Sequence, residues 1–149
     1  MADRATVLVV EARYYPEIAD AMVAGARPLL EAAGFACERV AVPGTFEIPA
    51  AIRLAADAGR GAAYAGFLAL GCVIRGETDH YEHISREVSR ALMDLAVRSA
   101  PIGFGILTCD TYDQAWHRAD PKQKNKGAEA ATACLRMIEL RRRFATVPR

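Results

Sequence analysis

Apolar and polar residues alternate along the chain in a pattern that predicts four strands separated by helices. Short apolar runs rich in β-branched residues cover 5–12, 35–42, 64–74 and 102–109. The third run, YAGFLALGCVI, has no charged residue, which is typical of a strand buried on both faces. Apolar residues at helical spacing cover 16–34, 45–61, 80–99, 111–119 and 126–144.

Several residues indicate where the expected helices begin and end. Gly34 suits a C-terminal stop, because glycine readily adopts the left-handed backbone found there. Thr45 predicts an N-cap, and Pro49 then falls in the first turn, where its missing N–H is not needed. Thr111 and Gln114 have the spacing of a capping box. These signals agree with the hydrophobic pattern.

Strands that alternate with helices of this length predict an α/β fold with a parallel sheet, right-handed crossovers and helices on both faces. In such sheets ligands bind beyond the carboxyl ends of the strands. Polar or aromatic stretches follow all four expected strands: RYY (13–15), PGTFE (43–47), RGETDH (75–80) and CDTYD (109–113). We therefore expect these stretches to meet at one edge of the sheet and to form the functional site.

Composition narrows the class of protein. A length of 149 residues fits one domain, 1–149, and 52% hydrophobic with 25% charged residues is a globular profile. A net charge of +1 gives no general attraction to nucleic acid or acidic membranes. No apolar run approaches the ~20 residues of a membrane span, and the first residues lack a signal-peptide pattern. The four cysteines form no CxxC motif, so we expect reduced thiols and a cytoplasmic protein.

Two motifs lie just before expected helix starts, where free N–H groups hold polar ligand atoms. In VPGTFEIP (42–49), Glu47 is suited to accept hydrogen bonds from hydroxyls; the alternative is that it only complements the helix dipole. In RGETDH, Gly76 permits close approach, and the N–H groups of Glu77 and Thr78 suit a small phosphate. Neither a P-loop nor a GxGxxG motif is present.

Individual side chains leave alternatives open. His80 suits a proton shuttle near neutral pH, or simply a hydrogen-bonding residue at a helix start. Its spacing of three to His83 does not match a zinc-protease motif, so no metal site is predicted. Arg118 suits a phosphate clamp or a solvated helix-end cation. The aromatic residues Tyr14, Tyr15, Phe46 and Phe104 suit either ring stacking or the core.

Taken in order, these motifs resemble the lumazine synthase (6,7-dimethyl-8-ribityllumazine synthase) family. The similar pieces are AR-Y-Y after the first strand, VPGTFEIP, GCVIRGETDHY, FGILTCDTYDQAWHRA and NKGAEAA, which together span about residues 6–140. PGxxEIP followed by GxVIRGxTxH is highly specific in this order.

The resemblance implies a flavodoxin-like three-layer α/β/α sandwich with a four-stranded parallel sheet. It implies an enzyme of riboflavin biosynthesis, a transferase that condenses 5-amino-6-(D-ribitylamino)uracil with 3,4-dihydroxy-2-butanone 4-phosphate, releasing phosphate and water. The family uses no metal or redox cofactor. It assembles as pentamers, often twelve in a capsid, with active sites between subunits, and riboflavin synthase is a further implied partner.

The resemblance also implies a set of site residues. The catalytic residues would be His80 for proton transfer and Arg118 for the phosphate. The substrate-binding residues would be Tyr14, Thr45, Phe46, Glu47, Val73, Ile74, Glu77, Thr78, Phe104 and Lys126. Within this set Tyr14 would stack on the ring, Glu47 would bind ribityl hydroxyls, and Phe104 would come from the neighbouring subunit. Glu77 and Thr78 would cradle the phosphate.

The chain departs from the family pattern in three places. Tyr14 and Tyr15 stand where the family usually has phenylalanine and commonly asparagine. The connection DPKQK (120–124) lacks the glycines of capsid-forming members, and the N-terminus is short. We therefore expect a pentamer rather than a sixty-subunit capsid. The departure at Tyr14-Tyr15 leaves a non-catalytic flavin- or lumazine-binding scaffold as the alternative function. Arg75, which the resemblance gives no catalytic role, is expected to form a structural ion pair.

Overall fold

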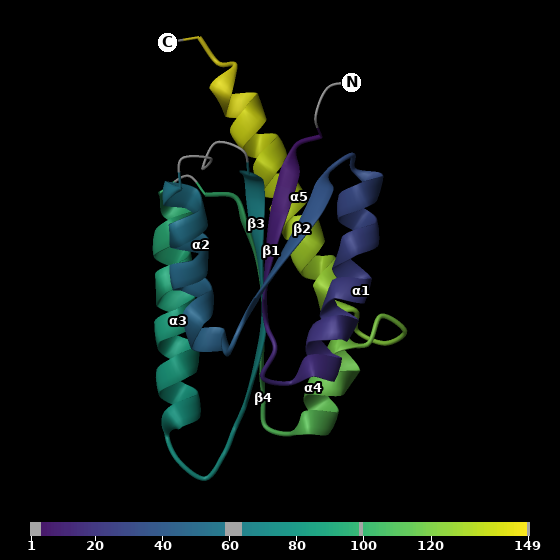
Figure 1. The fold of residues 1–149 in the computed structure, drawn as a ribbon, viewed down its shortest axis with the longest axis vertical. Helices are drawn as coiled ribbons and strands as arrows, with labels where there is room; N and C mark the ends of the chain where they lie inside the picture. Colours follow the sequence, from purple (N-terminus) through teal and green to yellow (C-terminus); the bar gives the residue numbers. More distant parts are fainter. Residues whose placement is uncertain (1–3, 59–63, 99, 149) are drawn as a thin grey trace.

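The sheet at the centre of the molecule has four parallel strands, which confirms the topology predicted from the hydrophobic pattern. The structure, a computed structural model, describes residues 4–58, 64–98 and 100–148 (Figure 1). The strands are β1 (Thr6–Ala12), β2 (Ala36–Val42), β3 (Tyr64–Ile74) and β4 (Ile102–Cys109), in the spatial order β2-β1-β3-β4. The edges of the sheet are therefore β2 and β4.

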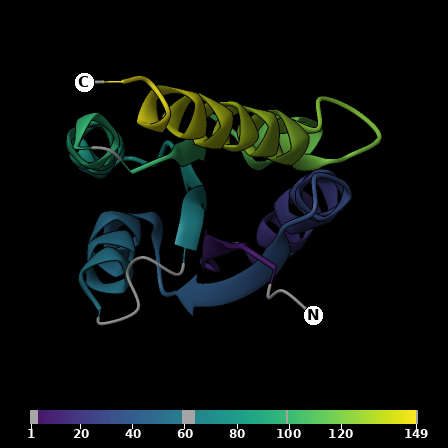
Figure 2. The ribbon, with the colours of Figure 1, turned by 90° about the horizontal axis from the view of Figure 1, so that it is seen from above.

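Helices cover both faces of this sheet and complete the three-layer sandwich. They are α1 (Pro16–Ala32), α2 (Ile48–Asp57), α3 (His80–Val97), α4 (Tyr112–Ala119) and α5 (Lys126–Ala145). Figures 1 and 2 show α2 and α3 on one face and α1, α4 and α5 on the other. The predicted helix over 80–99 ends at Val97, and residue 99 lies outside the described residues.

The predicted helix over 45–61 is the element that differs most from the structure. It begins as a separate 3-10 turn, η1 (Thr45–Glu47), and α2 follows with Pro49 in its first turn. Thr45 is not the N-cap of α2: Glu47 occupies that position, and the Thr45 hydroxyl donates to the carbonyl of Cys72 instead. The last three positions of the prediction, 59–61, lie outside the described residues.

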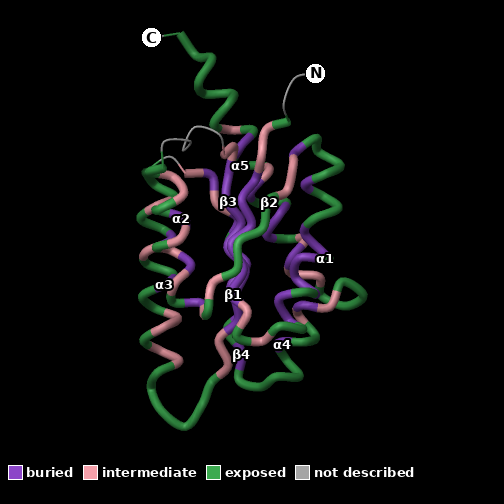
Figure 3. Tube along the Cα trace, in the orientation of Figure 1, coloured by how far each residue is buried: buried purple, intermediate pink, exposed green. Residues whose placement is uncertain are grey.

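The core consists of two apolar layers, one on each face of the sheet (Figure 3). Alternation along β1 sends Val7 and Val9 to the α1/α5 layer and Leu8 and Val10 to the α2/α3 layer. The middle of β3 is buried throughout and contributes to both layers, as its continuous apolar run predicts.

Two helix ends form as the sequence predicts. Gly34 has a φ of 92°, and its N–H donates to Glu31 while that of Phe35 donates to Leu30, the bond pattern of a Schellman motif. At α4 the Thr111 hydroxyl accepts from the Gln114 N–H at 3.2 Å. The Gln114 side chain reaches back to the N–H of Asp110, one residue before the cap, at 2.9 Å.

A buried carboxylate ties β1, β2 and α1 together, a feature that the sequence patterns did not predict. Glu11 on β1 is 2% exposed and accepts hydrogen bonds from Arg39 of β2 at 2.6 and 2.9 Å and from Arg13 at 2.6 Å. Arg13 also pairs with Asp20 on α1 at 2.9 Å. Burial alone would raise the pKa of Glu11, but the two guanidinium groups outweigh it and lower this pKa.

No helix among the described residues is long and apolar enough to cross a membrane. All four cysteines are unpaired thiols, and three of them are buried.

Candidate active site

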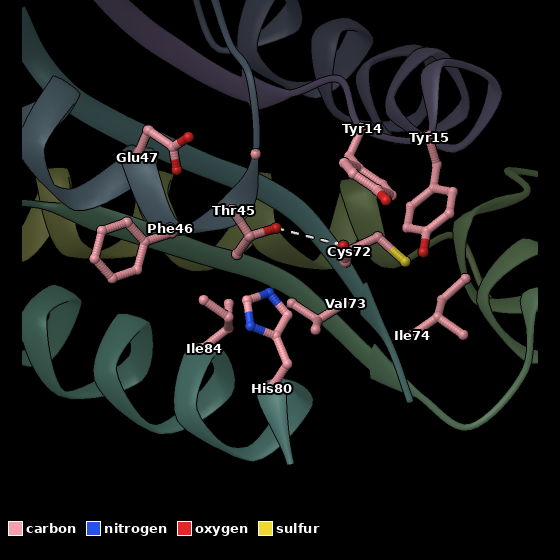
Figure 4. Close-up of a pocket in the computed structure, with 11 residues that line it drawn as sticks. Tyr14, Tyr15, Thr45, Phe46, Glu47, Cys72, Val73, Ile74, His80 and Ile84 are labelled. Carbon is pink, nitrogen blue, oxygen red and sulfur yellow. Dashed lines mark hydrogen bonds between the residues drawn. The ribbon is translucent and has the colours of Figure 1, made fainter. Parts of the chain in front are cut away.

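A hollow of about 580 Å³ lies at the carboxyl ends of β1 and β3, where the connections into α1, η1 and α3 meet (Figure 4). We call it the first hollow. Its lining residues are Tyr14, Tyr15, Gly44, Thr45, Phe46, Glu47, Cys72, Val73, Ile74, His80 and Ile84. Three separate connections therefore converge on one site, as expected for a parallel sheet.

A close contact between η1 and β3 shapes one wall of this hollow. Thr45 is buried, and its hydroxyl donates to the Cys72 carbonyl at 3.4 Å. A Cβ at Gly71 would lie only 2.7 Å from the Thr45 hydroxyl oxygen and 3.0 Å from Ile48, so only glycine leaves room for this packing. With Thr45 anchored in this way, Phe46 is 61% exposed and Glu47 half-buried beside it.

His80 is the first residue of α3, and its ring is directed toward Thr45, between Val73 and Ile84 (Figure 4). Its backbone N–H donates to the Thr78 hydroxyl at 3.4 Å. His83, three residues on, is not part of this wall and pairs with Asp79 at 3.1 Å on the exposed side of the helix. The fold thus brings only one of these two histidines into the hollow.

The opposite wall is aromatic. Tyr14 and Tyr15 meet edge to face with ring centroids 4.9 Å apart, and Tyr15 contacts Tyr112 at 6.1 Å. Tyr14 is 71% exposed, so one face of its ring is free for stacking. Burial, with Cys72 and Tyr14 nearby, raises the pKa of the Tyr15 hydroxyl above its ordinary value. Tyr15 therefore presents a protonated phenol at neutral pH.

The turn between β3 and α3 is held by Arg75. Its guanidinium pairs with Asp110 at 3.0 Å and with Glu82, and it lies 4.4 Å from the centre of the Tyr81 ring. These contacts confirm the expectation of a structural ion pair. Glu77 and Thr78 are exposed on the turn itself, outside the lining of the first hollow.

Gly76, in the same turn, has open space where a Cβ would project, with no atom within 4 Å. The backbone of the turn is therefore accessible from that side.

A second hollow of about 420 Å³ lies along the edge strand β4, between it and the ends of α4 and α5. It contains the three remaining predicted residues, Phe104, Arg118 and Lys126. Phe104 is 49% exposed, Arg118 donates to the Gln114 carbonyl at 3.1 Å, and Lys126 pairs with Glu129 at 2.9 Å. The two hollows share no lining residue, so one chain holds the predicted site as two separate halves.

The structure adds residues that sequence reasoning missed. Ile84 lies one helical turn after His80, a spacing that could have placed it on the same face. Glu129 joins the second hollow through its pairing with Lys126. The Cys72 thiol faces a buried environment that, with Cys109 nearby, raises its pKa to about 12, so it does not supply a thiolate nucleophile at neutral pH.

Within the described ranges, no group of three or more histidine, cysteine, aspartate or glutamate residues is placed to hold a metal ion. The side chains of the first hollow instead offer aromatic faces, one imidazole, one carboxylate and hydroxyl groups. Such a set can bind a planar polar ring and move protons at it.

Comparison with known proteins identifies the same family that the sequence motifs resemble. The family model for 6,7-dimethyl-8-ribityllumazine synthase matches residues 4–142. A protein of that name from Rhodopseudomonas palustris is 52% identical over 144 residues, which cover 95% of this chain and 88% of that protein. A protein of the same name from Agrobacterium fabrum is 53% identical over 141 residues, covering 93% of this chain and 95% of its own length. The chain belongs to the 6,7-dimethyl-8-ribityllumazine synthase family.

Proposed function

We propose that this chain is a lumazine synthase of riboflavin biosynthesis. It condenses 5-amino-6-(D-ribitylamino)uracil with 3,4-dihydroxy-2-butanone 4-phosphate to 6,7-dimethyl-8-ribityllumazine, with release of phosphate and water. One observation carries the proposal: in a chain of this family, one hollow collects Tyr14, Thr45, Phe46, Glu47, Val73, Ile74 and His80. These residues come from the β1–α1 connection, from η1, from the end of β3 and from the start of α3.

The first hollow accommodates the pyrimidine substrate. The free face of Tyr14 stacks on the planar ring, and the apolar side chains of Val73 and Ile74 lie against it. Glu47 accepts hydrogen bonds from the ribityl hydroxyls, which a carboxylate does well because it has only acceptors. The backbone at Thr45 and Phe46 holds the remaining polar atoms.

Protons have to move at several steps, and His80 is the residue placed to move them. The substrate amine adds to the ketone, the adduct loses water, phosphate leaves, the second amine closes the ring on the remaining carbonyl, and the cyclic adduct loses a second water. Loss of water requires a proton on the departing oxygen, and each addition requires removal of a proton from nitrogen. The His80 ring, directed into the hollow, can do both, whereas holding two substrates together supplies a separate and larger benefit.

The phosphate of the second substrate requires positive partners. The backbone N–H groups at Glu77 and Thr78, on the exposed turn before α3, form one side of the cradle. Arg118 supplies the other side, because a guanidinium matches two phosphate oxygens at once. Lys126 adds a second positive charge next to Arg118.

Arg118, Phe104 and Lys126 reach the first hollow from a neighbouring copy of the chain. What supports this is that they line a different hollow, at the edge strand β4, from the residues around His80. A ring of identical subunits brings the second hollow of each copy against the first hollow of the next. We propose a pentamer, acting in the cytoplasm and supplying its product to riboflavin synthase.

The test is to incubate the purified protein with both substrates and to follow the absorbance of the lumazine product together with release of inorganic phosphate. Equal amounts of lumazine and phosphate are expected, and omission of either substrate should abolish both signals. Binding of a lumazine without any turnover would overturn the proposal and favour a non-catalytic scaffold.

A further inference from the structure

Asn125 is the one non-glycine residue in the described ranges whose φ is positive, with φ 48° and ψ 51°. It stands directly before Lys126, the first residue of α5. A left-handed backbone brings Cβ close to the following carbonyl oxygen, so most L-residues avoid it, and asparagine and glycine adopt it most readily. The direction in which α5 begins therefore depends on this residue.

The side chain of Asn125 is fitted against α1. A Cβ at Gly25 would lie 2.1 Å from the Asn125 Oδ1 atom, so the hydrogen of Gly25 that occupies this direction faces the amide oxygen. Oδ1 is buried, and no conventional hydrogen-bond donor among the described residues reaches it. The Asn125 amide therefore occupies the space that a side chain at Gly25 would fill.

A second close contact holds the same end of α5 on α1. A Cβ at Gly127 would lie 2.1 Å from the carbonyl oxygen of Met22, so any larger residue would push the two helices apart. Gly25 on α1 and Gly127 on α5 thus let the backbones of the two helices approach on either side of Lys126.

The connection before Asn125 is tied to the end of α4. The N–H of Asn125 donates to the Asp120 carbonyl at 3.1 Å, and that of Lys124 donates to the His117 carbonyl at 3.1 Å. His117 is the neighbour of Arg118 in α4. The left-handed turn at Asn125 consequently helps to fix the position of Lys126, at the start of α5, relative to Arg118, near the end of α4.

We propose that Asn125 is a positioning residue, whose left-handed turn, for which Gly25 leaves room, places Lys126 beside Arg118 in the second hollow to bind the phosphate-bearing substrate. The inference rests on the proposed function and deepens it. Asn125 itself does not line either hollow, so it acts through Lys126.

The test compares KM in four variants, two of which should resemble the wild type and two of which should be impaired. Asn125→Gly keeps the left-handed backbone and should leave both KM values close to wild type. Asn125→Ala disfavours that backbone, and Gly25→Ala places a methyl group on the Asn125 side chain. Each should raise KM for the butanone phosphate about tenfold or more, since a small displacement of a positioning group has effects of this size. KM for the pyrimidine substrate should stay unchanged.

The double variant Gly25→Ala/Asn125→Gly is the decisive measurement. Removal of the Asn125 side chain takes away the two closest contacts of the Gly25→Ala methyl group and leaves the Ala128 backbone nitrogen 3.3 Å away, so KM should return close to the wild-type value. A merely structural role would lower Tm or the fraction of active protein while leaving both KM values unchanged, and that result would overturn the proposal. So would a double variant as impaired as Gly25→Ala alone.

Binding of inorganic phosphate, measured by calorimetry, separates this inference from the proposed function. If the wild-type protein forms no lumazine, the proposed function fails. The inference then still predicts that phosphate binds more weakly to Gly25→Ala than to the wild type, with recovery in the double variant. Equal phosphate binding by all of these proteins would overturn it.

Discussion

His80 lies at the first position of α3 with its ring in the first hollow, so its removal should affect the chemical step more than binding. We expect His80→Ala to lower kcat on the order of 10²-fold, the lower end of what general acid–base catalysis contributes, without abolishing turnover. The remaining rate comes from the positioning of two substrates. Steady-state kinetics with both substrates would measure it.

His83→Ala is the matched control for this measurement. His83 is on the same helix but exposed and paired with Asp79, so its removal should leave kcat unchanged. A His80→Ala enzyme with wild-type kcat, or one with no detectable turnover at all, would contradict the role given to the imidazole.

Arg118 is expected to act on binding of the phosphate-bearing substrate. Loss of a charge-assisted hydrogen bond costs about 1.5–3 kcal/mol. Arg118→Ala should therefore raise the apparent KM for that substrate about 10- to 100-fold. KM for the pyrimidine substrate should change little. Arg136→Ala, which removes an exposed arginine paired with Glu139 on α5, is the control. Equal effects of both variants on KM would show that only net charge matters.

For single residues, the sequence motifs predicted which side chains belong to the site but not which of them contact one another. Seven of the predicted residues line the first hollow because each lies at or just beyond the carboxyl end of a strand, which the sequence can indicate. The sequence could not predict that Gly71 leaves room for Thr45, because the two residues are 26 positions apart along the chain. Contacts of this kind depend on how η1 packs on β3.

Among the elements, hydrophobic periodicity predicted the strands and helices well because both faces of the sheet are covered. The error at Thr45 has a tertiary cause: its side chain is buried against β3, where the hydroxyl donates to the Cys72 carbonyl, and the chain forms a 3-10 turn before α2 begins. The charge inside β1 was not predicted either. Glu11 is stable there only because Arg39 of the neighbouring strand and Arg13 reach it.

Glu11 should make the stability of this sheet edge depend on pH. Its pKa is lowered in the folded chain from an ordinary value of 4.5, so the unfolded chain binds more protons below that pH. The stabilisation is therefore complete above about pH 5 and is lost as the pH falls through the folded pKa. Glu11→Gln should cost about 1.5–3 kcal/mol at pH 7, the range for hydrogen bonds to a charged group, because Arg13 and Arg39 are partly exposed and keep Asp20 as a partner.

Denaturant unfolding of both proteins between pH 7 and pH 3 would measure this dependence. The difference in unfolding free energy between wild type and Glu11→Gln should shrink toward low pH. A difference that stays constant over this range would show that packing, and not the charge of Glu11, is responsible.

For the whole molecule, the separation of the two hollows has the largest consequence. Sequence motifs list the residues of both halves together, and the resemblance assigned only Phe104 to a neighbouring copy, without saying which copy supplies Arg118 and Lys126. The fold shows that Phe104, Arg118 and Lys126 line the hollow beside β4, away from the hollow that contains His80. The proposed site built from two copies would join these hollows, and sedimentation of the purified protein should then show a pentamer.

A shared site also predicts that two impaired variants restore each other. In pentamers assembled from equal amounts of His80→Ala and Arg118→Ala chains, about one quarter of the sites should combine an intact first hollow with an intact second hollow. At low concentrations of the phosphate substrate, such mixed pentamers should reach about a quarter of wild-type activity, well above either parent. Pentamers of each variant formed separately and then combined without subunit exchange are the control. If co-assembled chains show only the average of the two parents, each site lies within one chain and the proposed interface is wrong.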